Sequence, residues 1–169
     1  AHMTISQALR KISKLKGALK EQLARAARSV VYTGDNVPAF SFASSSDLAE
    51  ALREELILLE THLRVTNAMT AFDFLGKPMT LAEATCRLQE SRGKIAWLKG
   101  LDTQAQSERT ETTYEEHYRT EGRTAVIKTT KCDLPEARRA AWIQREQDFF
   151  DALNDVVEAV NHRTTLVQR

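Results

Sequence analysis

Apolar residues recur every three or four positions in four long stretches of the chain, which is the spacing of one face of an α-helix. Start signals accompany these stretches. Thr4–Gln7 and Thr80–Glu83 form capping boxes, Ser44–Asp47 is a run of cap-forming residues, and Asp133–Glu136 places a proline in a first turn. The pattern therefore predicts helices over residues 4–29, 47–67, 80–99 and 133–160.

The apolar stripes of these helices define the candidate core. Glu55 projects within the second stripe, and a buried carboxylate is costly unless it is paired, so we expect an ion pair with a lysine of the first helix. Trp97 falls opposite the third stripe, where it either forms a second contact surface or is covered by a loop of the same chain. The stripes consist of Ile5, Leu9, Ile12, Leu15, Leu19, Leu23 and Ala26; Leu48, Leu52, Leu56, Leu59 and Leu63; Leu81, Ala84, Leu88, Ile95 and Leu98; and Ile143, Phe149, Phe150, Leu153, Val156, Val157 and Val160.

The segments between the helices carry turn and strand signals. The connector Val30–Ser46 contains the turn Thr33–Asn36 and indicates a small hairpin or an extended loop, whereas Phe72–Pro78 indicates a loop. After the last helix, Thr164–Val167 is a short β-prone piece.

β-branched and aromatic residues around Glu121–Gly122 predict a β-hairpin with strands over residues 114–120 and 123–132. Pairing residue 120 with residue 123 sets Glu115 opposite Lys128 and Tyr118 opposite Ala125. An isolated hairpin is marginally stable in water, so we expect this one to dock on helices or on another subunit.

Together these elements predict a mainly α protein, with four long helices in antiparallel pairs and one β-hairpin between helices 3 and 4, that is, α+β with minor β. We expect a single helical domain over residues 1–169, in which residues 103–132 form a polar linker plus the hairpin. Ala1 and His2 resemble a tag remnant ahead of Met3.

Charge is distributed unevenly along the chain, although its net value is only +1. Between Thr4 and Ser29 there are seven basic residues and one acid, and between Asp47 and Glu60 there are five acids and one base. We expect these segments to lie side by side and neutralise each other. The alternative is a basic face reserved for an anion, formed by Arg10, Lys14, Arg25 and Arg28.

Composition favours a cytoplasmic protein without a membrane partner. No apolar run approaches the roughly 18 residues needed to span a bilayer, and the densely charged N-terminus is unlike a signal peptide. Cys86 and Cys132 are too few for a disulfide framework and indicate free thiols. The small net charge argues against nucleic acid as the partner.

Motifs for catalysis, metals and cofactors are missing from the sequence, so we expect no catalytic residue, no metal ligand and no cofactor. There is no Glu-x-x-His pair, Cys-x-x-Cys motif or glycine-rich phosphate loop. Glu158 and His162 are four residues apart, but such a pair at a helix end is more often a surface pair, and Cys86 lies mid-helix rather than in an electropositive setting.

Polar and basic residues beside breaks in structure are the candidates for ligand binding, because arginine suits bidentate contacts with anions and Asn and Thr add directed hydrogen bonds. Helix C-capping and docking of the hairpin would explain the same residues. The candidates are Arg64, Asn67, Thr70, Arg119, Arg123, Lys128, Asn161, Arg163 and Thr164.

Several short motifs resemble a family of bacterial proteins often called septicolysins. They are residues 63–70 (LRVTNAMT), residues 76–84 (GKPMTLAEA), Tyr118–Arg119 with Ile127–Lys128 in the hairpin, and the stretch from Leu153 to Leu166. The resemblance implies a helical domain with a β-hairpin and carries no established active site. The family name implies a cytolysin, but the sequence has no aromatic-rich undecapeptide of the kind that cytolysins carry.

The leading hypothesis is a homo-oligomer, a dimer or a hexamer, that binds or assembles without catalysis. Its basis is the hairpin that needs a docking partner and the second face of the third helix. A more specific form is capture of an anionic small molecule, such as a signalling nucleotide, between subunits. The alternatives are an enzyme whose active site forms across subunits and a nucleic-acid binder that uses the basic face of the first helix.

Overall fold

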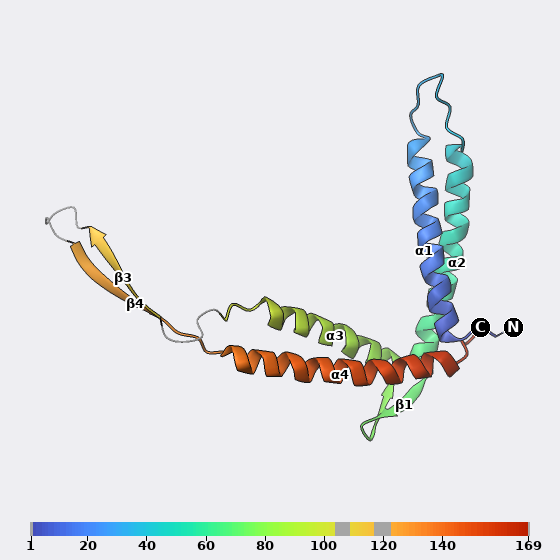
Figure 1. Cartoon of the computed structure of the whole chain (residues 1–169). Coiled ribbons are helices and arrows are strands. Elements are labelled where there is room, and N and C mark those ends of the chain that lie inside the picture. The colour runs from blue at the N-terminus through green and yellow to red at the C-terminus, as the bar shows by residue number, and fades with distance from the viewer. Residues whose placement is uncertain (1, 104–108, 117–122, 169) are drawn as a thin grey trace. The chain divides into compact units, whose positions relative to one another are not determined.

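The computed structural model describes residues 2–103, 109–116 and 123–168. It confirms a mainly helical protein with four helices and an antiparallel hairpin between the third and fourth (Figure 1). The element order is α1 (Ile5–Arg28), α2 (Phe42–Met69), β1 (Ala71–Phe74), β2 (Lys77–Thr80), α3 (Leu81–Gly100), β3 (Arg109–Glu116), β4 (Arg123–Thr130) and α4 (Glu136–Arg163).

The chain divides into two compact units. The first, unit 1, combines Ala1–Cys86 with Leu153–Arg169, and the second, unit 2, is Arg87–Ala152. Helices α3 and α4 therefore each contribute residues to both units.

The predicted start signals of α1 and α3 are confirmed. The Thr4 backbone N–H donates to Oε1 of Gln7 at 3.0 Å, and the Gln7 N–H donates to Oγ1 of Thr4 at 3.3 Å, which completes a capping box. At α3 the Glu83 N–H donates to Oγ1 of Thr80 at 3.1 Å. Both caps satisfy amide groups that would otherwise lack an acceptor at the helix start.

The predicted start of the second helix is wrong by about five residues. Ser41 is the N-cap, and its Oγ accepts a hydrogen bond from the Ser44 N–H at 3.1 Å. The run Ser44–Asp47 therefore forms part of the first two turns, and Ser45 is buried there. The connector is accordingly shorter than the predicted Val30–Ser46, and it contains no strand. Serine and aspartate occur both at helix N-caps and inside the first turns of a helix. The run Ser44–Asp47 therefore does not distinguish the cap from the helix that follows it.

The boundaries of the fourth helix also differ from the prediction. The N–H groups of Arg138 and Arg139 donate to the Pro135 carbonyl at 3.0 and 3.1 Å, and α4 begins at Glu136 rather than at Asp133. It continues through Arg163, beyond the predicted end at Val160.

In unit 1, α1 and α2 pack along a seam of apolar and small residues. Their buried seam residues include Ala8, Ala26 and Ala49, whose short side chains allow the two backbones to approach closely. One core cluster of this seam comprises Ala8, Ile12, Leu15, Leu59 and Leu166, with Met3, Leu52, Leu56 and Leu63 packed against it.

Ion pairs join α1 and α2, as the charge pattern predicts. Lys11 Nζ lies 2.6 Å from Glu55 Oε1, which confirms the expected lysine partner for Glu55, and Lys16 Nζ lies 2.9 Å from Glu60 Oε1. Both lysines lie at the edges of the seam, and the side chains of the Lys11–Glu55 pair are almost half exposed.

The C-terminal tail docks on the start of α1 and on α2. The Ile5 N–H donates to the Thr164 carbonyl at 2.9 Å, the Leu166 N–H donates to the Met3 carbonyl at 2.7 Å, and Thr165 forms a β-bridge with Thr4. The β-prone character predicted for Thr164–Val167 is thus expressed as a bridge instead of a strand.

The segment predicted as a loop, Phe72–Pro78, instead forms most of a second short hairpin. β1 pairs with β2 antiparallel, with Phe74 opposite Lys77. Leu75 and Gly76 form the turn and have φ values of 52° and 77°, which match the positive φ that a two-residue hairpin turn requires at both positions. The strands have four residues each, and Pro78 marks an edge position, so their sequence signal is weak.

The hairpin of unit 2 exists, but its predicted register is wrong by four residues. Glu111 lies opposite Lys128, Tyr114 opposite Ala125, and Glu115 opposite Thr124. β3 accordingly begins at Arg109, within the segment that the sequence indicates as polar and irregular, and Tyr118 and Glu121–Gly122 lie outside the described residues. A glutamate still lies opposite Lys128, as predicted, but it is Glu111 instead of Glu115.

Candidate functional site

The predicted ligand residues at the helix ends belong to unit 1, where the C-terminal end of α2 meets the tail that follows α4. The link is Thr66, a fully buried residue whose Oγ1 donates to the His62 carbonyl at 2.8 Å and accepts from the Val167 N–H at 2.9 Å. Among the predicted residues of these two chain ends, Arg64 and Arg163 are exposed, and Asn67 and Asn161 are partly buried.

Two predicted ligand residues in this region have clear structural roles. Thr70 caps α2, because its N–H and its Oγ1 both donate to the Thr66 carbonyl, at 3.0 and 2.7 Å. The Thr164 carbonyl accepts from the Ile5 N–H, as described above. Capping and docking therefore account for the two threonines, and the two arginines are the exposed members of the predicted set in this region.

The predicted ligand residues on the hairpin belong to unit 2. Arg123 is the first residue of β4 and lies opposite Glu116, and Lys128 lies opposite Glu111. Arg119 lies outside the described residues. Ala125 and Ile127, between these positions, are exposed.

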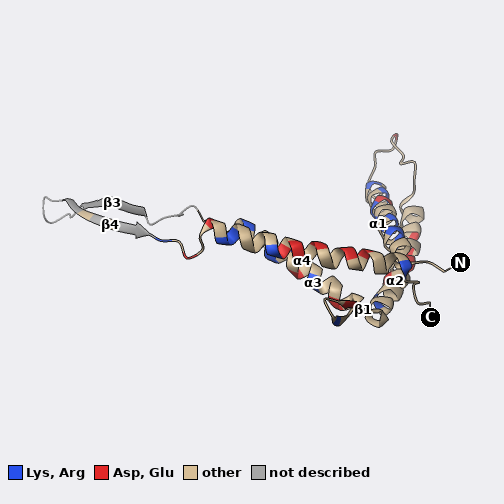
Figure 2. Ribbon diagram, turned by 60° about the horizontal axis from the view of Figure 1, so that its bottom comes forward, with Lys and Arg blue, Asp and Glu red and all other residues tan. Residues whose placement is uncertain are grey.

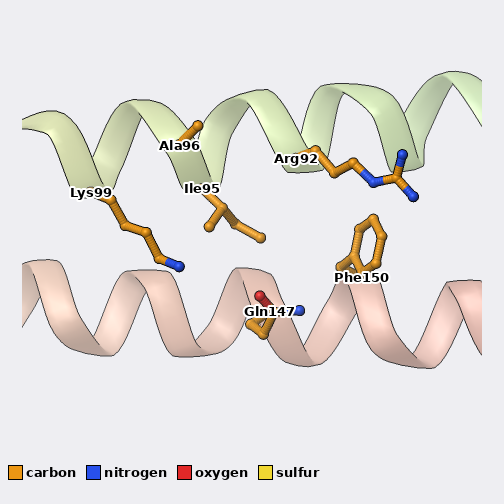
Figure 3. Close-up of a pocket in the computed structure, with 6 residues that line it drawn as sticks. All are labelled: Arg92, Ile95, Ala96, Lys99, Gln147 and Phe150. Atoms are coloured by element: carbon orange, nitrogen blue, oxygen red, sulfur yellow. The ribbon is translucent and has the colours of Figure 1, made fainter.

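A groove between α3 and α4 within unit 2 is a site that sequence reasoning did not identify. Its volume is about 290 Å³, close to the lower end of the range for small-molecule pockets. Figure 3 shows Ile95 and Lys99 of α3 pointing toward α4 and Phe150 of α4 pointing toward α3, with the Arg92 side chain extending along α3 above the Phe150 ring. The lining consists of Arg92, Ile95, Ala96, Lys99, Gln147 and Phe150.

Helical spacing explains why these residues share one side of the helix pair. Arg92 and Lys99 are seven residues apart on α3, which is two turns, and the buried Ile95 lies between them. Gln147 and Phe150 are three residues apart on α4 and therefore lie on one face. The seven-residue spacing of two cations about an apolar residue is the sequence signal that could have revealed the α3 half of the groove.

The cations of the groove have no acidic partner among the described residues. The Arg92 guanidinium lies over the Phe150 ring, 5.1 Å from its centroid, and makes no ion pair in the described ranges; the same holds for the Lys99 ammonium. The nearest acid with a contact to the lining is Asp151, whose Oδ1 accepts from the Gln147 amide nitrogen at 3.0 Å. Two positive charges thus border an apolar floor, and one carboxylate is hydrogen-bonded to the lining residue Gln147.

The other side of the same helix pair is closed by aromatic and ionic contacts. The rings of Trp97 and Trp142 meet edge to face with centroids 6.2 Å apart. Lys94 Nζ lies 3.0 Å from Glu146 Oε2 and 5.5 Å from the Trp142 centroid, and Ser91 Oγ donates to Glu146 Oε1 at 3.0 Å. Trp97 therefore contacts another helix, where the two predicted alternatives were a second contact surface and a covering loop, and the residue is 56% exposed.

A polar network ties the end of α3 to the start of α4. Arg139 donates to the carbonyls of Lys99 and Leu101, at 3.3 and 2.7 Å, and to Glu136 Oε1 at 2.9 Å. Thr103 also donates to the Glu136 carboxylate. These hydrogen bonds, with that from Arg139 first, lower the pKa of Glu136 below its ordinary value because they favour the ionised form.

Charge is segregated along α4, as the blue and red segments of Figure 2 show. Its cations gather near its start and its acids follow. The groove lies near the boundary between these two regions of α4. The α4 residues that line it, Gln147 and Phe150, are uncharged.

Apolar side chains are exposed over much of the α1–α2 hairpin, residues 5–69. Val31 in the connector is 84% exposed, and Ile57 and Leu58 on α2 are 53% and 58% exposed. Phe40 is anchored in part, because the Arg25 guanidinium lies 4.2 Å from its ring centroid and Ser29 Oγ donates to its carbonyl at 2.7 Å. The large exposed side chains of the hairpin are Leu9, Leu23, Val30, Val31, Tyr32, Val37, Phe40, Phe42, Leu48, Ile57, Leu58 and Met69.

Searches for other kinds of site give negative results within the described part of the chain. It contains no cluster of three or more residues that could hold a metal ion, and Cys86 and Cys132 are free thiols. None of the helices in the described ranges combines the length and the apolar character that crossing a bilayer requires.

Comparison of the chain with family models, with curated proteins and with solved structures finds no match.

Proposed function

We propose that this protein is a non-catalytic homo-oligomer that assembles through its α1–α2 hairpin, with a second copy of the chain as the partner. The observation that carries the proposal is the apolar surface exposed on this hairpin. Two packed helices bury one face each, and an apolar outer face requires a further layer. Twelve large apolar side chains are exposed on this hairpin, and a standard interface buries about 800 Å² per partner.

Charge complementarity supports a second copy as the occupant. Within the described ranges, Arg10, Lys14, Lys20 and Arg28 of α1 have no carboxylate partner. On α2, Asp47 and Glu54 likewise have no cationic partner among the described residues. Cations are therefore left over on one helix and acids on the other, so packing α1 of one copy against α2 of the next neutralises both.

The helical positions of the α2 residues suit such an interface. Ile57 and Leu58 follow Glu54 by three and four residues and therefore lie on its face of α2. In a two-fold dimer the same patch is used twice, so each α1–α2 contact is repeated by symmetry. The resulting arrangement is a bundle of four helices, and larger rings up to a hexamer follow if a second surface is used.

Ligand capture is the second part of the proposal. We assign this oligomer the binding of an anionic small molecule in the cytoplasm, a setting in keeping with the free Cys86 and Cys132. Arg64 and Arg163, both exposed in unit 1, are candidate contacts for such a ligand. The resemblance to septicolysins remains a prediction about family membership, without toxin activity.

Light scattering coupled to gel filtration tests the assembly. At tens of micromolar protein, the mass should be at least twice the chain mass of 19.1 kDa. The double variant Ile57→Glu, Leu58→Glu places two carboxylates in the interface and should return the mass to 19.1 kDa with helicity by circular dichroism unchanged. Ala137→Glu, an exposed substitution on α4, is the matched control and should leave the oligomer intact. A wild-type protein that elutes as a monomer would refute the proposal.

A further inference from the structure

We infer that the groove lined by Arg92, Lys99 and Phe150 is a binding site for an organic dianion with a flat apolar middle. The inference deepens the ligand-capture part of the proposed function. It does not depend on the assembly part, because all lining residues lie within unit 2 of a single chain.

The two cations define the length of the ligand. Seven residues of α-helix rise by about 10 Å, so the Arg92 and Lys99 side chains start about 10 Å apart along α3. Figure 3 shows them at opposite ends of the groove, with Lys99 directed toward α4 and Arg92 extending along α3 above the Phe150 ring. A ligand with one anionic group near each end can satisfy both cations at once.

The floor between the cations defines the middle of the ligand. Ile95 is buried and Ala96 adds a small apolar surface, so an apolar body displaces water there at little cost. Phe150 provides an aromatic face at the Arg92 end, where the guanidinium already lies over the ring. An aromatic or other flat body therefore suits the space of about 290 Å³.

Orientation of the charged groups favours a carboxylate or phosphate at the Arg92 end. The Arg92 guanidinium lies 5.1 Å from the Phe150 ring centroid and has no carboxylate partner in the described ranges, so its donors are available for a bidentate contact. Lys99 adds a single flexible ammonium at the other end. The Asp151 carboxylate accepts a hydrogen bond from the Gln147 amide, and its charge disfavours a third negative group beside that amide.

The contrast between the two sides of the helix pair supports a binding role. On the closed side, Lys94 is paired with Glu146 and covered by Trp142. On the groove side, the two cations lack such partners among the described residues, and the apolar floor lies between them. Cations that served only the pairing of α3 with α4 would need carboxylates across the groove, and α4 places a phenyl ring and an amide there.

Calorimetric titration with biphenyl-4,4′-dicarboxylate tests the inference, with biphenyl-4-carboxylate as the matched monoanion. The dianion should bind the wild-type protein about fivefold more tightly than the monoanion, which corresponds to one exposed ion pair of about 1 kcal/mol. Arg92→Gln and Lys99→Gln should each remove this preference. Arg138→Gln, an exposed arginine of α4 outside the lining, should preserve it.

Three results would overturn the inference: no binding of the dianion, equal binding of both compounds, or an unchanged preference in both groove variants. A preference that is lost only in Arg64→Gln and Arg163→Gln would move the ligand to unit 1, thereby refuting the groove while supporting ligand capture. The mass of the same samples by light scattering reports on assembly separately, so failure of the groove and failure of the oligomer are distinguishable.

Discussion

Thr66→Val is predicted to loosen the C-terminal tail without disturbing the shape of the core. Thr66 is fully buried, and its Oγ1 is the acceptor for the Val167 N–H at 2.9 Å. Valine retains the branched shape but leaves that N–H without an acceptor, which costs about 1–3 kcal/mol for a buried group. Val167 is only partly buried, so water replaces some of the loss, and we expect about 1 kcal/mol.

Thr66→Ser is the matched control, because it keeps the hydroxyl and removes a buried methyl group. That methyl is worth about 0.8 kcal/mol, so both variants should lose a similar free energy of unfolding in urea. Amide hydrogen exchange separates them. Exchange at Val167 should accelerate about fivefold in Thr66→Val, the equivalent of about 1 kcal/mol, and stay at the wild-type rate in Thr66→Ser.

The Leu166 amide donates to the Met3 carbonyl at 2.7 Å, so its exchange rate reports whether the loosening extends beyond Val167. All samples should be compared at one protein concentration, because assembly makes stability depend on concentration. If Val167 exchanges at the wild-type rate in Thr66→Val, the hydroxyl does not hold the tail and the reasoning fails.

Three further predictions concern single contacts. Leu75→Asn should raise the free energy of unfolding in urea by about 1 kcal/mol, because leucine at φ 52° is strained and asparagine tolerates that region; a loss of stability would contradict this. Glu136→Gln should cost stability at pH 7, and the difference from wild type should shrink as pH falls below about 4.3. The reason is that a carboxyl with a lowered pKa stabilises the fold above its unfolded pKa and loses this effect as it protonates, so a pH-independent difference would refute it. A double-mutant cycle on Lys11 and Glu55 should give a coupling of at most about 1 kcal/mol that weakens in salt, and a salt-independent coupling would argue against this almost half-exposed pair.

Local signals predict the helices well and the short strands poorly. The capping box of Thr4 and the cap of Thr80 act within four residues, so the sequence is sufficient to locate them. The sequence does not predict β1 and β2, because their turn is Leu75–Gly76, without the usual Asn or Asp. Strands of four residues are also too short to show a clear alternation of apolar and polar positions. Several registers of β3 against β4 place compatible residues opposite each other. The sequences of the two strands therefore do not select a single register.

The pairing of α1 with α2 was predictable from charge, whereas the groove was not. Seven basic residues before a segment with five acids indicate two neighbouring helices, and Lys11–Glu55 bears this out. No sequence pattern predicts that Phe150, which is distant from Arg92 in the chain, provides the ring beneath the Arg92 guanidinium. The predicted ligand residues lie at helix ends, because local sequence signals mark the ends of helices. No such signal marks a groove between two helices that are distant in the chain.

The sequence by itself determined the helices, their caps and the complementary charges of α1 and α2, because each of these depends on neighbours a few residues apart. Only the tertiary structure decided which side of the α3–α4 pair is closed and which is open. Trp97, Trp142 and the Lys94–Glu146 pair fill one side, and on the other side Arg92 and Lys99 face a phenyl ring and an amide. That outcome depends on the axial register and rotation of two helices distant in the chain, which follow from packing the large side chains of both.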